Sequence, residues 1–294
     1  MRSTREPRIS AVVLCAVLLA GVLFGGRARA AQSAFKKDNL VAWCVVPFDA
    51  AGRSPEERAR LLDELGIRKL AYDWRGRHVD EFEREIEACR KHDIEFLAFW
   101  QGHPEFYKLV GKHDVHPQIW RIVPSPGGES REERVEAAAK ELMPAVERTR
   151  ELGCTLGLYN HGGWGGKPQN MVAVCEWLRE NADADHVGIV YNFHHGHEQI
   201  DEWDRVFRLM KPYLLCLNLN GMSKDGPKIL PIGEGEHEKE MIRTVVKSDY
   251  TGPIGILDHR PQMDAEKSLR QNLSGLRGIL RDIGAEKALE TYGN

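Results

Sequence analysis

The chain has 294 residues, of which 42% are hydrophobic and 29% charged, and its formal net charge is −3 at pH 7. This apolar content, with charges of both signs, excludes wholesale disorder and suits one large domain or two small ones. An acidic chain does not attract phosphate backbones as a whole, which argues against general nucleic-acid binding.

Residues 1–30 have the layout of a secretory signal peptide. Three arginines in the first eight residues precede an apolar run over Ala11–Phe24, and Ala28 and Ala30 form an A-x-A pattern. The run is short for a membrane span. We expect cleavage after Ala30, a secreted or periplasmic protein, and no stable membrane span in the mature chain. The alternative is an uncleaved anchor.

The expected cleavage also changes the charge of the chain. Residues 1–30 hold five arginines and one glutamate, so the mature chain would carry 36 basic and 43 acidic residues, a net charge of −7. Five cysteines remain, without a C-x-x-C spacing, and three of them fall in apolar strand-like runs. Buried free thiols are the expected state, because a core of this size does not need disulfides.

Short, nearly continuous apolar runs recur along the mature chain and are typical of parallel strands covered on both faces. We predict eight strands, at Leu40–Phe48, Ile67–Trp74, Ile94–Trp100, Thr155–Asn160, His186–Asn192, Leu214–Asn220, Lys228–Gly233 and Gly252–Asp258. Helical patterns fill most of the gaps. The first has Ser54 and Glu57 as a capping box and Gly66 as its stop. The others cover Asp80–His92, Arg131–Leu152, Gln169–Asn181, Gln199–Met210, Glu236–Lys247 and Ala265–Ile283.

This alternation predicts an α/β fold, a single (β/α)8 TIM barrel. The barrel would span residues 38–284, after a lead-in over 31–37 and before a C-terminal tail over 285–294. We expect a long loop after the third strand and no full helix between the sixth and seventh strands. A doubly wound sheet is the competing fold, but the segment after the first strand lacks its glycine-rich phosphate turn.

Polar and aromatic residues follow the predicted strands, and a TIM barrel carries its active site at these strand ends. Tryptophan faces and paired amides suit a polyhydroxylated ring, so we predict a site for a small carbohydrate. The expected substrate-binding residues are Trp74, Trp100, His103, Asn160, Trp164, Asn192, His194, Asn218, Asn220 and His259. The expected catalytic residues are His161, His195 and Glu234, because imidazole and carboxylate groups transfer protons near neutral pH.

At these positions the chain resembles the xylose isomerase-like TIM-barrel superfamily, which includes sugar-phosphate isomerases and epimerases. The resemblance covers roughly Asp38–Leu280 and rests on "LGLYNHGG", "VGIVYNFHHGH" and "PIGEGEHEKEMIRTVVKSDYTGPIGILDH". It implies a divalent metal held by Glu, Asp, His and Glu on the fourth, fifth, sixth and eighth predicted strands. This chain departs at every one of these positions, which hold Tyr159, Asn192, Asn218 and either Leu257 or Asp258.

The altered ligands leave the question of a metal open at the level of sequence. One divalent ion (Zn, Mn or Co) would need a new site, for which His161, His195 and Asp258 are candidates. Without a metal, the resemblance implies a sugar isomerase, epimerase or 3-keto-glycoside lyase that moves a proton next to a carbonyl.

Three other functions compete with this one. A non-catalytic carbohydrate-binding barrel is the main alternative. A glycoside hydrolase would need two carboxylates, and Glu234 with Asp258 is the one obvious pair. An endonuclease fits poorly with the acidic charge.

Overall fold

A computed structural model describes residues 34–293. Eight parallel strands form a closed barrel in chain order, and β8 pairs with β1. The strands are β1 (Leu40–Trp43), β2 (Lys69–Tyr72), β3 (Glu95–Trp100), β4 (Gln118–Ile122), β5 (Thr155–Tyr159), β6 (Val187–Asn192), β7 (Leu214–Leu219) and β8 (Ile254–Leu257). This confirms the predicted TIM barrel.

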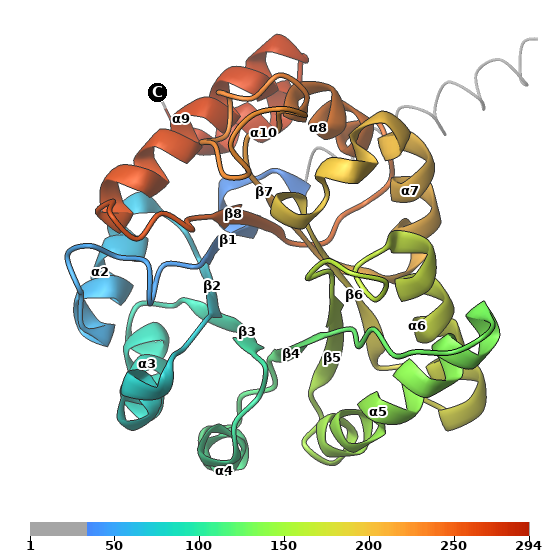
Figure 1. The fold of residues 1–294 in the computed structure, drawn as a ribbon. Helices are drawn as coiled ribbons and strands as arrows, with labels where there is room; N and C mark the ends of the chain where they lie inside the picture. The colour runs from blue at the N-terminus through green and yellow to red at the C-terminus, as the bar shows by residue number, and fades with distance from the viewer. Residues whose placement is uncertain (1–33, 294) are drawn as a thin grey trace, which may run out of the picture.

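Helices surround the barrel in a ring (Figure 1). They are α2 (Pro55–Leu65), α3 (Phe82–Lys91), α4 (Pro104–His113), α5 (Arg131–Glu151), α6 (Pro168–Ala182), α7 (Trp203–Met210), α8 (Glu238–Val246), α9 (Ala265–Asp282) and α10 (Glu286–Leu289). The predicted capping box at the start of α2 is present, and Gly66 ends this helix with φ +67°. Within residues 34–293, no helix combines the length and apolar character that a membrane crossing requires.

The expected signal peptide lies outside the described residues. The segments on either side of the barrel pack against each other: Tyr292 donates a hydrogen bond to the carbonyl of Phe35 at 2.8 Å. Ala285 and Ala288 are fully buried, so the residues after α9 are part of the packed structure.

The structure differs from the predicted strands at two places. Gln118–Ile122 forms β4 within the stretch that we expected to be a long loop. Lys228–Gly233 is not a strand, and its one pairing is an isolated bridge between Leu230 and Gly221. Prolines explain much of this second difference, since Pro231 has no N–H to donate to a ladder. The predicted fourth, fifth and sixth strands are therefore β5, β6 and β7, and α8 follows the β7 loop.

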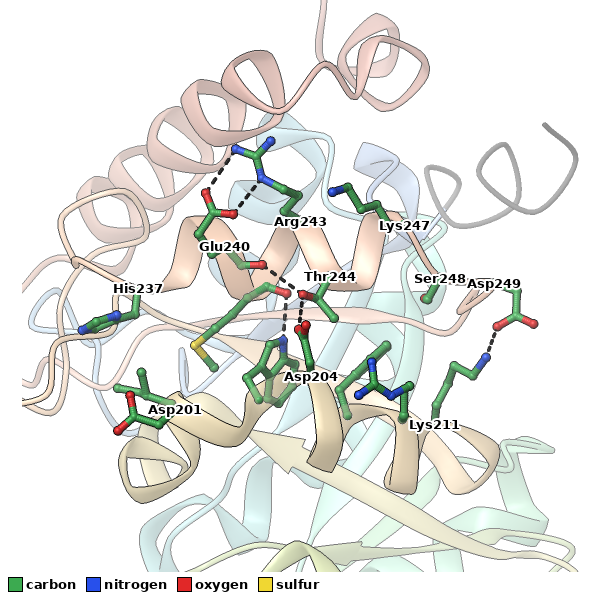
Figure 2. Close-up of a pocket in the computed structure, with 15 residues that line it drawn as sticks. Asp201, Asp204, Lys211, His237, Glu240, Arg243, Thr244, Lys247, Ser248 and Asp249 are labelled. Carbon is green, nitrogen blue, oxygen red and sulfur yellow. Dashed lines mark hydrogen bonds and ion pairs between the residues drawn. The ribbon is translucent and has the colours of Figure 1, made fainter. Parts of the chain in front are cut away.

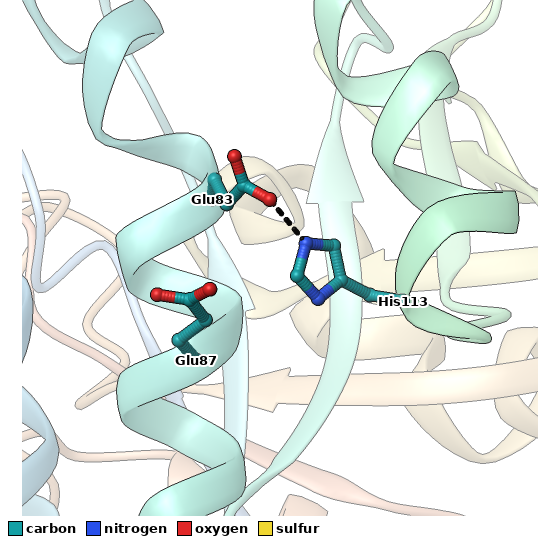
Figure 3. Close-up of side chains that lie close together, drawn as sticks. All are labelled: Glu83, Glu87 and His113. Atoms are coloured by element: carbon teal, nitrogen blue, oxygen red, sulfur yellow. Dashed lines mark hydrogen bonds and ion pairs between the residues drawn. The ribbon is translucent and has the colours of Figure 1, made fainter.

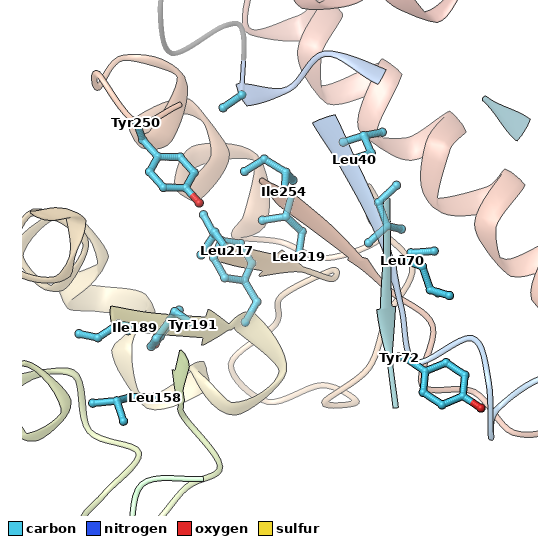
Figure 4. Packing of buried hydrophobic residues seen from close by; sticks show 14 of the residues in the cluster. Leu40, Leu70, Tyr72, Leu158, Ile189, Tyr191, Leu217, Leu219, Tyr250 and Ile254 are labelled. Atoms are coloured by element: carbon cyan, nitrogen blue, oxygen red, sulfur yellow. The ribbon is translucent and has the colours of Figure 1, made fainter. Parts of the chain in front are cut away.

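Alternation along the strands produces two apolar layers. One lies between the sheet and the helices and includes Leu40, Leu70, Tyr72, Leu158 and Ile189 (Figure 4). The other fills the barrel and includes Val41, Ala71, Trp120, Val190 and Leu257. Because Leu257 belongs to the inner layer, the next residue, Asp258, points the opposite way.

The five cysteines of the described residues are free and buried, as expected. Burial raises the pKa of Cys216 and Cys44 above the usual value, and the nearby Asp73 carboxyl raises that of Cys44 further. They contribute packing rather than reactivity.

Candidate active site

An aromatic floor closes the barrel at the carboxyl ends of its strands. It consists of Trp43, Trp100, Trp120 and Tyr159, which come from β1, β3, β4 and β5. The ring centroids of Trp43 and Trp120 are 4.7 Å apart, and those of Trp100 and Tyr159 are also 4.7 Å apart. Trp100 is the exposed edge of this floor, since it is half-buried while the other three are buried.

Four histidines form a row beside this floor. The ring centroids of His161 and His195 are 4.5 Å apart, those of His195 and His194 are 4.3 Å apart, and those of His194 and His259 are 5.3 Å apart. We call these four the histidine row. It joins the floor at one end, where His161 lies 6.2 Å from Trp100. The loops after β5, β6 and β8 thus bring four predicted residues together.

Three members of the row have no polar partner. Among residues 34–293, no hydrogen bond or ion pair involves the ring nitrogens of His161, His195 or His259. Burial, and then the neighbouring His194, lowers the pKa of His195 to about 3. Burial also lowers the pKa of His194 to about 4. At neutral pH the rings of His194 and His195 are therefore uncharged, and each ring has one nitrogen with a lone pair.

The predicted asparagines hold the strand ends together. Asn160 accepts from the backbone N–H of Asn192 at 2.7 Å and donates to its carbonyl at 3.0 Å. The side chain of Asn192 donates to the hydroxyl of Tyr159 and accepts from the N–H of His194 at 3.1 Å. These bonds use both ends of each amide, so Asn160 and Asn192 position the site's loops.

Each asparagine of β7 and its loop has one buried amide atom without a partner within the described residues, Nδ2 of Asn218 and Oδ1 of Asn220. Asn220 donates to the carbonyls of Gly221 at 2.7 Å and Lys228 at 3.2 Å, which fixes the β7–α8 loop. Asn218 is fully buried against Gly255, and its Nδ2 has no partner within the described residues. Asn218 is thus a buried donor inside the barrel.

Two carboxyl groups are buried near the site. Asp73, at the end of β2, is 2% exposed, and burial raises its pKa to about 8. Asp258 is fully buried and accepts from the hydroxyl of Ser268, and burial raises its pKa to about 7. Neither carries a full negative charge at neutral pH.

Several predicted residues lie outside the row and floor. Trp74 packs against Phe82 and donates to the carbonyl of Trp100 at 2.7 Å, and His103 caps α4 by accepting from Glu105 at 3.1 Å. Trp164 lies under the guanidinium of Arg134, 4.8 Å from the ring centroid. These three residues pack or cap.

Glu234 is exposed and accepts from Gln271 of α9 at 2.6 Å. No contact given for the described part of the chain joins it to the histidine row. Its position after a predicted strand was the reason to expect it at the site, and that strand does not form.

Sequence reasoning missed two members of the site. Trp120 belongs to β4, which was not predicted. Phe48 lies in the loop after β1, and its ring centroid is 4.0 Å from that of His259. The sequence offered a signal for Phe48 alone, because it ends a predicted strand.

The comparisons with known proteins agree with this architecture. The family model described as "Xylose isomerase-like TIM barrel" matches residues 27–279. The chain belongs to this family. No curated protein sequence is significantly similar to it.

Solved structures of family-like barrels share its fold. A 3-keto-D-glucoside 4-epimerase from E. coli superposes with a TM-score of 0.62 at 14% identity, covering 82% of this chain and 100% of the epimerase. The IOLI protein, which has a bound zinc atom, gives 0.61 at 10% identity, covering 83% and 98%. A D-psicose 3-epimerase gives 0.54 at 11% identity, covering 86% and 99%.

The donor atoms in this xylose isomerase-like chain do not fit the family's metal. The four positions at which the resemblance implies metal ligands fall on β5 to β8 and hold Tyr159, Asn192, Asn218 and, facing inward, Leu257. Burial raises the pKa of Tyr159, so its hydroxyl stays neutral. Two amides, a phenol and an alkyl group offer no negative charge to balance a divalent ion.

The predicted replacement site also does not assemble. Asp258 turns towards Ser268 of α9, away from His161 and His195. Within residues 34–293, one group of three potential ligands has all its donor atoms within 4.8 Å of one another, and it consists of Glu83, Glu87 and His113.

This group lies between α3 and α4, outside the barrel (Figure 3). Glu83 accepts from His113 at 2.6 Å and also pairs with Lys112 at 2.6 Å. The three ligands could hold a cation there, but their present contacts tie the two helices together.

A hollow of about 970 Å³ runs between α7 and α8 (Figure 2). Its apolar lining includes Trp203, whose indole N–H donates to the carbonyl of Met241 at 2.9 Å. Charged side chains on its rim pair with neighbours, as Glu240 does with Arg243 at 2.9 Å. It holds no arrangement of unpaired acid and base comparable to the histidine row.

Proposed function

We propose that this protein is an exported, sugar-active isomerase, epimerase or lyase that moves a proton next to a carbonyl without the family's metal. His161 and His195 transfer the proton. The observation that carries this proposal is their pairing: two imidazoles from different loops lie 4.5 Å apart without polar partners, beside an aromatic floor.

The chemistry follows from the states of these side chains. Isomerisation, epimerisation and elimination from a 3-keto-glycoside all begin with removal of a proton from the carbon beside a carbonyl. Burial keeps the ring of His195 neutral at pH 7, so a ring nitrogen has a lone pair for that proton, and the negative charge that develops on the substrate stabilises the imidazolium that forms. His161, on the other side of the pair, is placed to return a proton to the neighbouring carbon or oxygen.

The related barrels support sugar as the substrate class. Two of them are a 3-keto-D-glucoside 4-epimerase and a D-psicose 3-epimerase. The floor here supplies what a sugar ring requires, because the edge of Trp100 offers an apolar face and the row offers hydrogen-bonding groups at its side. The pattern of residues 1–30 supports export, which N-terminal sequencing of the mature protein would test.

A non-catalytic carbohydrate-binding barrel is the second candidate. The observation that favours it is the absence, among the described residues, of any carboxylate in contact with the histidine row. An emptied enzyme site with an aromatic floor can still hold a sugar.

Proton exchange separates the two candidates. Purified protein is incubated in D2O with free sugars and 3-keto-sugars, with and without EDTA, and deuterium next to the carbonyl is followed by NMR. We expect exchange that survives EDTA and falls at least about a hundredfold in His161→Ala and in His195→Ala. His116→Ala, an exposed histidine that bonds the carbonyl of Leu152, is the matched control. Near-full exchange in both variants would sink the assignment, and binding without exchange would favour the second candidate.

A further inference from the structure

The carboxyl ends of the strands form the mouth of the barrel, where two cationic side chains have no acidic partner among the described residues. The mature chain would have a net charge of −7. Yet two carboxyl groups that follow β2 and β8, Asp73 and Asp258, are buried with pKa values of about 8 and about 7. Two exposed cations also follow strands of the barrel, Arg75 after β2 and Lys228 in the loop between β7 and α8.

Arg75 is held over an aromatic ring rather than paired with an acid. Its guanidinium lies 5.4 Å from the centroid of Phe48, whose ring contacts His259 at 4.0 Å. One of its nitrogens, Nη1, donates to the carbonyls of Asp73 at 3.1 Å and Trp74 at 2.7 Å. No ion pair within residues 34–293 involves Arg75, so its Nη2 and Nε groups are available to an anion.

Lys228 lies on the β7–α8 loop beside His194. Its carbonyl accepts from His194 at 3.4 Å and from Asn220 at 3.2 Å, which fixes its backbone against the histidines. Its ammonium has no carboxylate partner in the described part of the chain. Lys224 in the same loop differs, because it pairs with Asp201.

The two cations also affect the pKa values of neighbouring histidines. Besides burial, the Lys228 ammonium makes a smaller contribution that lowers the pKa of His195 and His197. After burial, Arg75 lowers the pKa of His259. Unpaired cations, with no carboxylate in contact with the histidine row among residues 34–293, favour an anion over a metal cation at this site.

We infer that the sugar carries an anionic substituent (a carboxylate, a sulfate or a phosphate) that binds between Arg75 and Lys228. The reacting carbons then lie at His161 and His195, at the far end of the row. This inference rests on the proposed function, since it names the substrate class of the same site. It also gives the mouth a source of positive charge where the family's metal does not fit.

Sugar binding measured by calorimetry tests the inference on the whole mature protein. The probes are D-glucose, D-glucuronate, glucose 6-sulfate and glucose 6-phosphate, at about 20 and about 200 mM salt. We expect at least one anionic sugar to bind at least tenfold more tightly than glucose, and the added salt to weaken that binding. The anion bound most tightly identifies the substituent.

Variants locate the anion. Arg75→Gln and Lys228→Gln should each weaken the anionic sugar about tenfold and leave glucose unchanged, whereas the matched control Lys224→Gln should change neither. Thermal melting checks that each variant folds. Equal affinity for glucose and all three anions would overturn this inference and leave the proposed function standing. If the unmodified protein bound none of the four sugars, the inference and the proposed sugar site would both fail. Loss of deuterium exchange in a protein that still binds sugar would instead contradict only the proposed proton transfer.

Discussion

Asp73 offers a direct test of the electrostatics at the barrel mouth. Its carboxyl group is 2% exposed, its Oδ1 accepts from the N–H of Val46 at 3.4 Å, and its Oδ2 has no partner in the described residues. Burial raises its pKa from 3.8 to about 8, and Arg75 offsets only part of that rise. The variant Asp73→Asn keeps the size of the side chain and an oxygen for Val46, but it cannot ionise.

The sign and size of the effect follow from proton linkage. Between about pH 4 and pH 8 the folded protein binds one proton more at this position than the unfolded chain does. The free energy of unfolding therefore falls as pH rises, by about 1.4 kcal/mol per pH unit. Asp73→Asn removes this dependence. Between about pH 5 and pH 7.5, the free energy of unfolding of the variant should therefore rise by about 3 kcal/mol relative to that of the unmodified protein.

Urea unfolding, followed by tryptophan fluorescence at several pH values, measures this difference. Asp185→Asn is the control, because Asp185 is exposed and its replacement should leave a difference that does not vary with pH. A constant difference between Asp73→Asn and the unmodified protein would mean that Asp73 is ionised in the folded state. The argument for an uncharged acid at the mouth would then be wrong.

Two further stability predictions concern the barrel and its helices. Gly255→Ala would place a methyl group 1.7 Å from Oδ1 of Asn218, so we expect a loss of about 1–3 kcal/mol in urea unfolding; an unchanged midpoint would contradict that contact. Glu85→Gln removes the partner of Arg58, to which Glu85 is joined by two bonds of 3.0 Å with both side chains buried. We expect it to cost about 3–5 kcal/mol, against at most about 1 kcal/mol for the exposed pair in Glu56→Gln. Equal costs for the two variants would refute the role of burial.

Periodicity in the sequence predicted most of the barrel because most strands are covered on both faces. Runs such as those of β6 and β7 are almost wholly apolar, and short runs of this kind are typical of buried parallel strands. The strand β4 reads "QIWRI", which is short and includes a charge, and Pro117 and Pro124 flank it. Its strand character comes from pairing with β3 and β5, which a local pattern does not record.

Local sequence patterns do not record how strands pair, and this also explains the differences between the expected and the observed site. The four histidines of the row follow well-marked strands and lie together because the ends of parallel strands meet on one face, whereas His103 follows β3 but caps α4. Glu234 follows a segment that forms a loop rather than a strand, and within residues 34–293 no hydrogen bond or ion pair joins it to the histidine row. Whether Leu257 or Asp258 faced inward depended on a shift of one residue, and only the pairing of β8 with β1 and β7 decides it.

The residues at the four positions where the resemblance implies metal ligands are best understood together. A divalent ion inside a barrel needs nearby negative charge, and a carboxylate there needs the ion, because either alone is a buried charge without a partner. Replacing one ligand would leave the others uncompensated, whereas replacing all four leaves a neutral interior. Tyr159 and Asn192 satisfy each other by a hydrogen bond, and Leu257 packs in the inner layer. Charge at the mouth then has to come from outside the barrel, which is where Arg75 and Lys228 lie.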